Sequence, residues 1–110
     1  MMEINKLCKM AHENASGKGF WEDIEAIEHP LINNEMNNAI STRLMLIVCE
    51  VAEAAEGLRK NDAVNFREEL ADVAIRLFDL CGGLDIDLEA EIMVKMQKNK
   101  LRPYKHGKQF

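Results

Sequence analysis

Apolar residues recur along this chain with the period of an α-helix, and no stretch alternates as a β-strand does. In residues 2–15 they fall at i, i+3, i+4 and i+7, which is the spacing of one helix face. These positions are Ile4, Leu7, Cys8 and Ala11. We expect the helix to end where Gly17 and Gly19 bracket a turn. A less regular acidic stretch, residues 21–29, precedes Pro30.

A second and longer helix is predicted for residues 34–60. Its apolar stripe consists of Leu44, Ile47, Val48, Val51, Ala55 and Leu58. Residues 44–49 are apolar around the whole circumference, so this segment should be buried on more than one side. In a domain this small, burial on several sides predicts an interface between subunits.

Two further helices follow. Residues 63–81 carry the stripe Phe66, Leu70, Val73, Leu77 and Leu80, and Gly82-Gly83 is expected to end that helix. Asp85 or Asp87 can cap a last helix over residues 88–100, with Ile92 and Met96 inward. Residues 103–110 are expected to form a tail. The sequence therefore predicts one all-α domain, residues 1–110, built as a short four-helix bundle.

Composition places this domain in a reducing compartment. The cysteines are odd in number and lie far apart in apolar helical contexts, at Cys8, Cys49 and Cys81. They are interpreted as core residues. The first 14 residues are amphipathic, so we expect no signal peptide, and no segment is long and apolar enough to span a membrane. A cytoplasmic location is the expectation.

Charge is distributed unevenly. All 19 acidic residues and eight of the 14 basic ones lie within residues 1–91, giving −11, while the remainder carries +6. Such a chain could pair with itself, or bind a metal and a polyphosphate together. Because the acidic part would repel a phosphate backbone and no groove-reading motif is present, we expect no nucleic-acid partner.

Two acid pairs carry the candidate chemistry. Glu50 and Glu53 are three residues apart, as are Glu69 and Asp72, and on a helix that spacing puts both carboxylates on one side. If the two helices face each other, the four groups converge and repel unless a cation is bound. Mg2+ prefers oxygen ligands and keeps some of its waters, so the pairs predict a Mg2+ site open to a phosphate-bearing substrate.

Other interpretations of the acid pairs remain open. Each pair could be a solvated helix face, and Glu56 could be a solvated glutamate that extends the acidic face. Arg76 could balance the cluster or pair with Asp72. A di-iron bundle would need Glu-x-x-His, and Zn2+ usually takes His or Cys, but no His follows either pair.

The acid pairs stand in CEVAEAAE and EELADV, which resemble the E-x-x-E and E-x-x-D signature of the MazG-like, all-α nucleoside triphosphate pyrophosphohydrolases. HENASGKGFW resembles the opening of small members, in which a His and a Trp nine residues later lie near the nucleotide. KNKLRPYKHGK resembles the C-terminal strip of small phage and bacterial members. One departure is Cys49, where many members have a second Glu.

The resemblance implies a four-helix core that is completed by assembly into a dimer or a dimer of dimers. It implies Mg2+-dependent hydrolysis, with Mn2+ as a possible substitute, of a nucleoside triphosphate to its monophosphate and pyrophosphate. Glu50, Glu53, Glu69 and Asp72 would be the catalytic metal ligands. One of them, for instance Glu53, could also take a proton from the attacking water.

Substrate contacts are expected at both ends of the chain. Trp21 could stack on a base or fill the core, and His12 could contact the nucleotide or be structural. Lys18 could reach a phosphate across the subunit interface. The C-terminal strip offers cations and polar groups for pyrophosphate, each of which could instead be simply solvent-exposed. These candidates are Lys95, Lys98, Asn99, Arg102, Tyr104 and Lys105.

Two functions thus remain. The first is a nucleotide pyrophosphohydrolase. The second is a non-catalytic oligomeric helical module that binds nucleotide or a partner protein without turnover.

Overall fold

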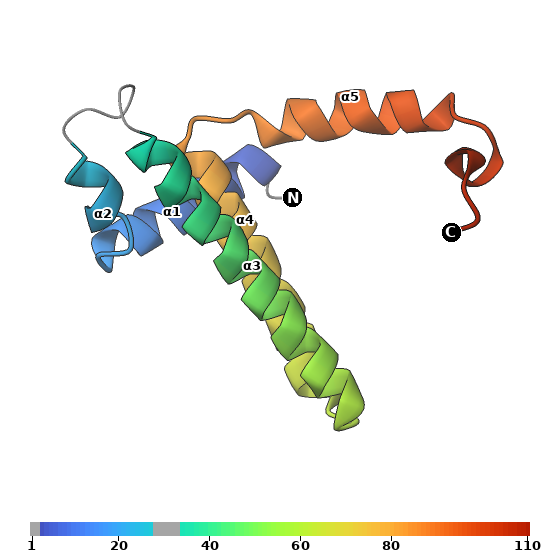
Figure 1. Ribbon diagram of the computed structural model, residues 1–110, viewed down its shortest axis with the longest axis horizontal. Coiled ribbons are helices and arrows are strands. Elements are labelled where there is room, and N and C mark those ends of the chain that lie inside the picture. The colour runs from blue at the N-terminus through green and yellow to red at the C-terminus, as the bar shows by residue number, and fades with distance from the viewer. Residues whose placement is uncertain (1–2, 28–33) are drawn as a thin grey trace.

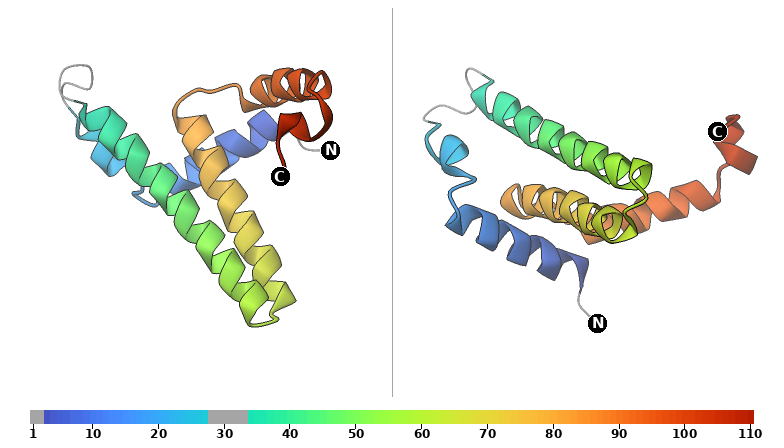
Figure 2. Two further views of the ribbon diagram at one scale, coloured as in Figure 1. Left: turned by 45° about the vertical axis from the view of Figure 1, so that its right-hand side comes forward. Right: turned by 90° about the horizontal axis from the view of Figure 1, so that it is seen from below.

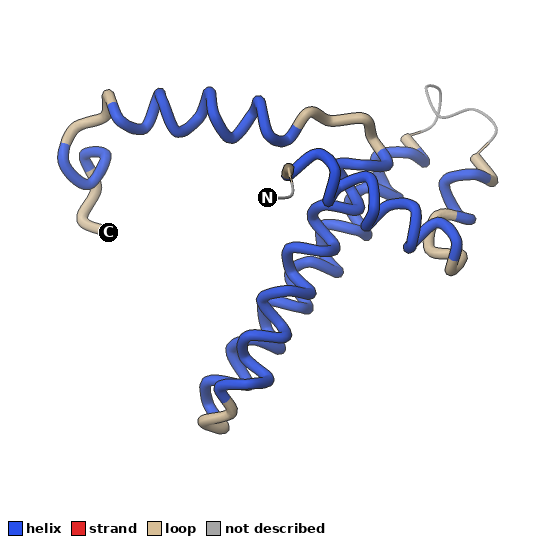
Figure 3. The backbone as a smooth tube through the Cα atoms, turned by 180° about the vertical axis from the view of Figure 1, so that it is seen from behind, coloured by secondary structure: helices blue, strands red, loops and turns tan. Residues whose placement is uncertain are grey.

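The computed structural model describes residues 3–27 and 34–110, and all regular structure in these ranges is helical (Figures 1 and 3). This confirms the all-α prediction. The elements are α1 (Ile4–Gly17), α2 (Glu22–Glu25), α3 (Glu35–Arg59), α4 (Ala63–Gly83), α5 (Leu88–Lys100) and the 3-10 turn η1 (Tyr104–Gly107). The expected acidic stretch contains the single turn α2, while His29 and Pro30 lie outside the described residues.

Helices α3 and α4 form a long antiparallel hairpin (Figures 1 and 2). Asn61 supplies the turn with a left-handed φ of 56°. Asp62 caps α4, because its side chain accepts a hydrogen bond from the Asn65 amide at 3.0 Å. Near this turn the helices almost touch: a Cβ on buried Gly57 would lie 3.1 Å from the Phe66 amide nitrogen.

Helix α1 packs across the C-terminal end of α4 (Figure 2), and this contact gives the two glycines there a second role. The helix ends at Gly83, as the Gly82-Gly83 prediction expected, although both glycines are still helical. A Cβ on Gly82 would collide with the backbone oxygen of Cys8, and one on Gly83 would collide with the Trp21 ring. The two glycines therefore stand at the helix end and also permit close approach of neighbouring segments.

Helix α5 points away from the hairpin and packs mainly against the start of α1 (Figures 1 and 2). Glu89 Oε1 accepts a hydrogen bond from the amide of Ile4 at 2.7 Å, and Asn5 Oδ1 accepts one from the amide of Glu89 at 3.2 Å. Asp87, rather than Asp85, caps α5 through the Ala90 amide at 3.0 Å. Each of these helices therefore helps to satisfy the other's free N-terminal amides.

Much of the expected core is exposed in the single chain. The radius of gyration is 16.7 Å, against about 13 Å for a compact chain of this length. In the predicted α3 stripe, Leu44, Val48, Val51 and Leu58 are 49–59% exposed. Met96, predicted to face inward, is also exposed. The sequence pattern correctly marked apolar faces, but a single chain does not supply the surface that would cover them.

Most buried hydrophobic side chains of the described residues gather where α1 meets the end of α4, namely Cys8, Trp21, Leu80 and Cys81, while Ala54 is buried on α3. The core prediction is therefore confirmed for two of the cysteines and is wrong for Cys49, which is exposed on α3. Among the described helices, none combines the length and the apolar character needed to cross a membrane.

Candidate functional site

The hairpin brings three of the four predicted metal ligands together. Oxygen atoms of Glu50 on α3 and of Glu69 and Asp72 on α4 all lie within 4.8 Å of one another. We call these three residues the acidic cluster. Glu53 is exposed and is not part of this group, although it interacts with Glu50 and Glu69. Its role as a ligand stays a prediction.

Glu69 is the least satisfied member of the acidic cluster. Its Oε2 atom is covered and has no hydrogen-bond partner in the described part of the chain. Loss of solvation, contacts with Glu53 and Glu50 and the charge of Asp72 together raise the pKa of Glu69 to about 7. A covered carboxylate among other carboxylates is an arrangement that a bound cation would stabilise.

Arg76 supplies the positive charge beside the cluster. Its Nε donates to Glu50 Oε1 at 2.8 Å, and this hydrogen bond holds the pKa of Glu50 below its usual range. The arginine thus pairs across the hairpin with Glu50, rather than along α4 with Asp72. Of the two alternatives for Arg76, the structure agrees with balancing the cluster.

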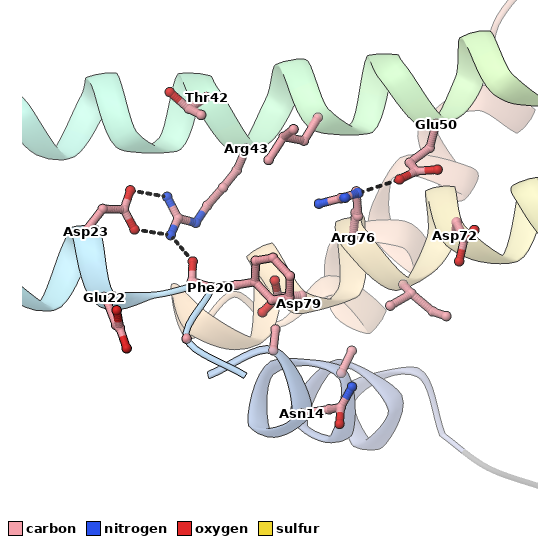
Figure 4. A pocket seen from close by; sticks show the side chains of 15 residues that line it. Asn14, Phe20, Glu22, Asp23, Thr42, Arg43, Glu50, Asp72, Arg76 and Asp79 are labelled. Atoms are coloured by element: carbon pink, nitrogen blue, oxygen red, sulfur yellow. Dashed lines mark hydrogen bonds and ion pairs between the residues drawn. The ribbon is translucent and has the colours of Figure 1, made fainter. Parts of the chain in front are cut away.

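A pocket of about 600 Å³ runs from the acidic cluster toward the turn after α1 (Figure 4). Glu50, Asp72 and Arg76 line one end, and Phe20, Asp23 and Arg43 line the other. The Phe20 side chain is 63% exposed at this second end. The pocket therefore joins a charged end to an end with an accessible aromatic ring.

Trp21 and its partners form a second polar group of residues, the tryptophan cluster. This cluster consists of His12, Trp21, Arg43 and Asp79. Trp21 is 4% exposed, and its Nε1 donates to Asp79 Oδ1 at 2.7 Å. The same oxygen lies 3.1 Å from His12 Nδ1, and the His12 ring meets the indole edge-on at 4.6 Å. His12 and Trp21 thus come together through an aspartate, while their expected contact with a nucleotide stays a prediction.

Arg43 covers the face of the indole, with its guanidinium carbon 4.4 Å from the ring centroid. The same guanidinium donates to both carboxylate oxygens of Asp23, at 2.7 and 3.0 Å, and to the Phe20 carbonyl at 2.7 Å (Figure 4). This arginine lowers the pKa of Asp23. The burial of Trp21 agrees with the core-filling alternative, while stacking on a base stays an untested prediction.

The remaining predicted contact residues lie apart from the acidic cluster. Lys18 is exposed at the end of α1. Lys95, Asn99, Arg102 and Tyr104 lie on α5 and the segment after it, which Figure 1 shows extending away from the hairpin. Arg102 contacts His106 at 3.2 Å, and Tyr104 is exposed. Glu56 pairs with Arg59 at 2.9 Å on the surface, in agreement with the solvated alternative for that glutamate.

Sequence reasoning missed three residues of the pocket: Phe20, Arg43 and Asp79. A signal existed for two of them. Asp79 extends the polar flank 69, 72, 76 of α4 by three residues, and Arg43 lies seven residues before Glu50 on the same face of α3.

Searches of family models, of curated proteins and of solved structures found no match to this chain.

Proposed function

We propose that this protein is a Mg2+-dependent nucleoside triphosphate pyrophosphohydrolase of the MazG-like all-α type. The observation that carries the proposal is the convergence of Glu50, Glu69 and Asp72 at one end of a pocket of about 600 Å³. Convergence distinguishes these carboxylates from ordinary solvated helix faces. The pocket beside them has the size range of small-molecule sites.

The residues present fit a hard divalent cation. The donor atoms are carboxylate oxygens only, which suits Mg2+ rather than Zn2+. Glu69 Oε2 lacks a hydrogen-bond partner among the described residues, and an unpaired covered oxygen is available for coordination. Glu50, Glu69 and Asp72 would hold the ion, and Glu53 would join them in the four-ligand version of the site. Mn2+, which also accepts carboxylate oxygens, would substitute.

Bound Mg2+ would polarise phosphate oxygens and lower the pKa of a coordinated water. The protein's own residues would supply the rest. Glu53 is exposed beside Glu50 and Glu69, so its carboxylate would accept the proton of a water attacking the α-phosphorus. The products would be a nucleoside monophosphate and pyrophosphate. The far end of the pocket, with the accessible ring of Phe20, would receive the base.

Self-association belongs to the same proposal. The exposed apolar stripe of α3 and the large radius of gyration favour a second copy as the surface that buries this face. A second copy would also allow the basic α5 strip, which extends away from its own hairpin (Figure 1), to approach a neighbouring site. The cations of that strip would then neutralise the leaving pyrophosphate.

The test is incubation of the purified protein with Mg2+ and a panel of nucleoside and deoxynucleoside triphosphates. Pyrophosphate and orthophosphate are measured separately. Metal-dependent pyrophosphate with an equal amount of monophosphate supports the proposal, and the ranking of the panel gives the base and sugar preference. Orthophosphate alone would show that another bond is cut. Release of neither product by folded protein would favour the non-catalytic binding module.

A further inference from the structure

Arg76 makes a contact that competes with a metal ion for Glu50. Its Nε donates to Glu50 Oε1 at 2.8 Å, and Glu50 is one of the carboxylates that converge on the candidate metal position. The contact comes from the opposite helix of the hairpin, so it is not a local pairing of neighbouring residues. In the described structure, Arg76 therefore occupies part of the coordination capacity of the acidic cluster.

The terminal N–H groups of the Arg76 guanidinium have no acceptor in the described part of the chain. Its two terminal nitrogens donate no hydrogen bond to any group in residues 3–27 and 34–110. Figure 4 shows the guanidinium at the pocket, between Glu50 and the end formed by Phe20 and Arg43. The Arg76 side chain is 37% exposed, whereas that of Glu50 is 13% exposed. The arginine is thus a half-satisfied donor that faces the space where a ligand would lie.

Arg43 offers an instructive contrast in the same pocket. Its guanidinium is engaged by Asp23, by the Phe20 carbonyl and by the Ala39 carbonyl at 3.0 Å. Those bonds would all have to break before Arg43 could bind a ligand. Arg76 would have to break one. Of the two pocket arginines, Arg76 is the one that can change partners at small cost.

We propose that Arg76 holds Glu50 while the site lacks metal, and moves to a phosphate group of the nucleotide when a divalent cation takes that carboxylate. This inference rests on the proposed function, and it adds a residue that couples the two ligands. A guanidinium presents paired N–H groups that match two phosphate oxygens. Metal binding would thereby release the donor that the nucleotide needs.

The exchange has a thermodynamic consequence. Arg76 competes with the metal in the absence of nucleotide, and cooperates with it in the presence of nucleotide. Because coupling between two ligands is reciprocal, phosphate binding to Arg76 would in turn leave Glu50 free for the metal. A purely structural ion pair would not give effects of opposite sign on the two ligands.

The experiment is calorimetric titration of wild type, Arg76→Gln and Arg76→Lys with Mn2+ alone. Each is then titrated with an α,β-methylene nucleoside triphosphate at saturating Mg2+. We expect Arg76→Gln to bind Mn2+ about tenfold more tightly and the analogue about tenfold or more weakly. Arg76→Lys keeps the charge but not the planar fork, so it should bind Mn2+ as wild type does and the analogue with reduced affinity.

The matched control is Arg59→Gln, which removes an exposed Arg–Glu pair within α3 and should change neither affinity. If Arg76→Gln binds Mn2+ no more tightly than wild type, the exchange is refuted while the metal site stands. Unchanged analogue affinity in Arg76→Lys would refute it even if Arg76→Gln failed to fold. If wild type and Glu69→Gln both bind no Mn2+, the metal site is absent, and the proposed function falls together with this inference.

Discussion

The two polar clusters of this molecule differ in how completely their hydrogen bonds are satisfied. In the tryptophan cluster, the indole N–H and the Arg43 guanidinium both have partners. In the acidic cluster, Arg76 pairs with Glu50 alone among the three carboxylates, and Glu69 Oε2 has no partner in the described chain. Satisfied networks stabilise a fold, whereas unsatisfied charges are tolerated where a ligand completes them. We therefore expect the tryptophan cluster to contribute to stability, and the acidic cluster is the one proposed to bind a ligand.

The largest expected effect is on catalysis. Glu69→Gln and Asp72→Asn should each lower pyrophosphate release by roughly 100-fold or more, because each removes a proposed ligand of the Mg2+ ion. Neither substitution should lower the melting temperature of the metal-free protein, because each removes a charge from a repulsive group. Activity assays and thermal unfolding by circular dichroism test both statements. A large drop in melting temperature would place the acidic cluster among the structural networks instead.

A methyl group at Gly83 should instead lower the stability of the fold. Gly83→Ala would press its Cβ into the Trp21 ring, and overpacking of this kind costs about 3 kcal/mol of unfolding free energy. Urea unfolding measures the loss. The control is Gly17→Ala on α1, where a Cβ meets nothing within 4 Å and where alanine should be neutral or slightly stabilising. Equal stabilities of the two variants would contradict tight packing around Trp21.

Removal of Arg43 should lower the free energy of unfolding somewhat less than Gly83→Ala does. Arg43→Met would leave the Phe20 and Ala39 carbonyls without this donor and would uncover the indole face, for a loss of about 2 kcal/mol. The ion pair with Asp23 contributes little of this, because Asp23 is half exposed. Arg59→Met is the control and should change stability by less than about 0.5 kcal/mol. The urea midpoints of the two variants show whether Arg43 stabilises the fold through its packing and hydrogen bonds. Equal midpoints would mean that it contributes only an exposed charge.

Sequence periodicity predicted the helices and the acidic pairs well, because both depend on spacing within one helix. The i, i+3 spacing of Glu69 and Asp72 sufficed to anticipate a shared face, and the pattern of α3 sufficed to mark an apolar side. What it could not predict were contacts between elements. The glycines of α4 marked the helix end correctly, but only the packing of α1 and Trp21 shows that a side chain is also excluded there.

The same limit applies to the site. Arg76 is three residues from Asp79 and four from Asp72 on one helix, but its partner is Glu50 across the hairpin. Trp21 follows Gly17 and Gly19 by four and two residues in the sequence, which suggests an accessible turn, yet its ring is buried because Asp79 and Arg43 meet it from α4 and α3. Those arrangements depend on the rotation of α3 against α4, which no local pattern encodes.

The smallest expected effect is a pH dependence that separates the two clusters by sign. Glu69 has a pKa raised to about 7 from 4.5, so its contribution to stability is fully present below 4.5 and is lost as pH rises to about 7. Asp23 has a lowered pKa, so its contribution to stability is present above pH 3.8 and is lost as pH falls.

In EDTA, the melting temperature of wild type relative to Glu69→Gln should therefore decrease between pH 5 and pH 7 and then level off. The melting temperature of wild type relative to Asp23→Asn should stay constant between pH 5 and pH 7. Mg2+ should abolish the pH dependence caused by Glu69, because a bound cation takes the place of the proton. A pH-independent difference between wild type and Glu69→Gln would mean that Glu69 is an ordinary solvated glutamate, and the contrast between the two clusters would then rest on the activity measurements alone.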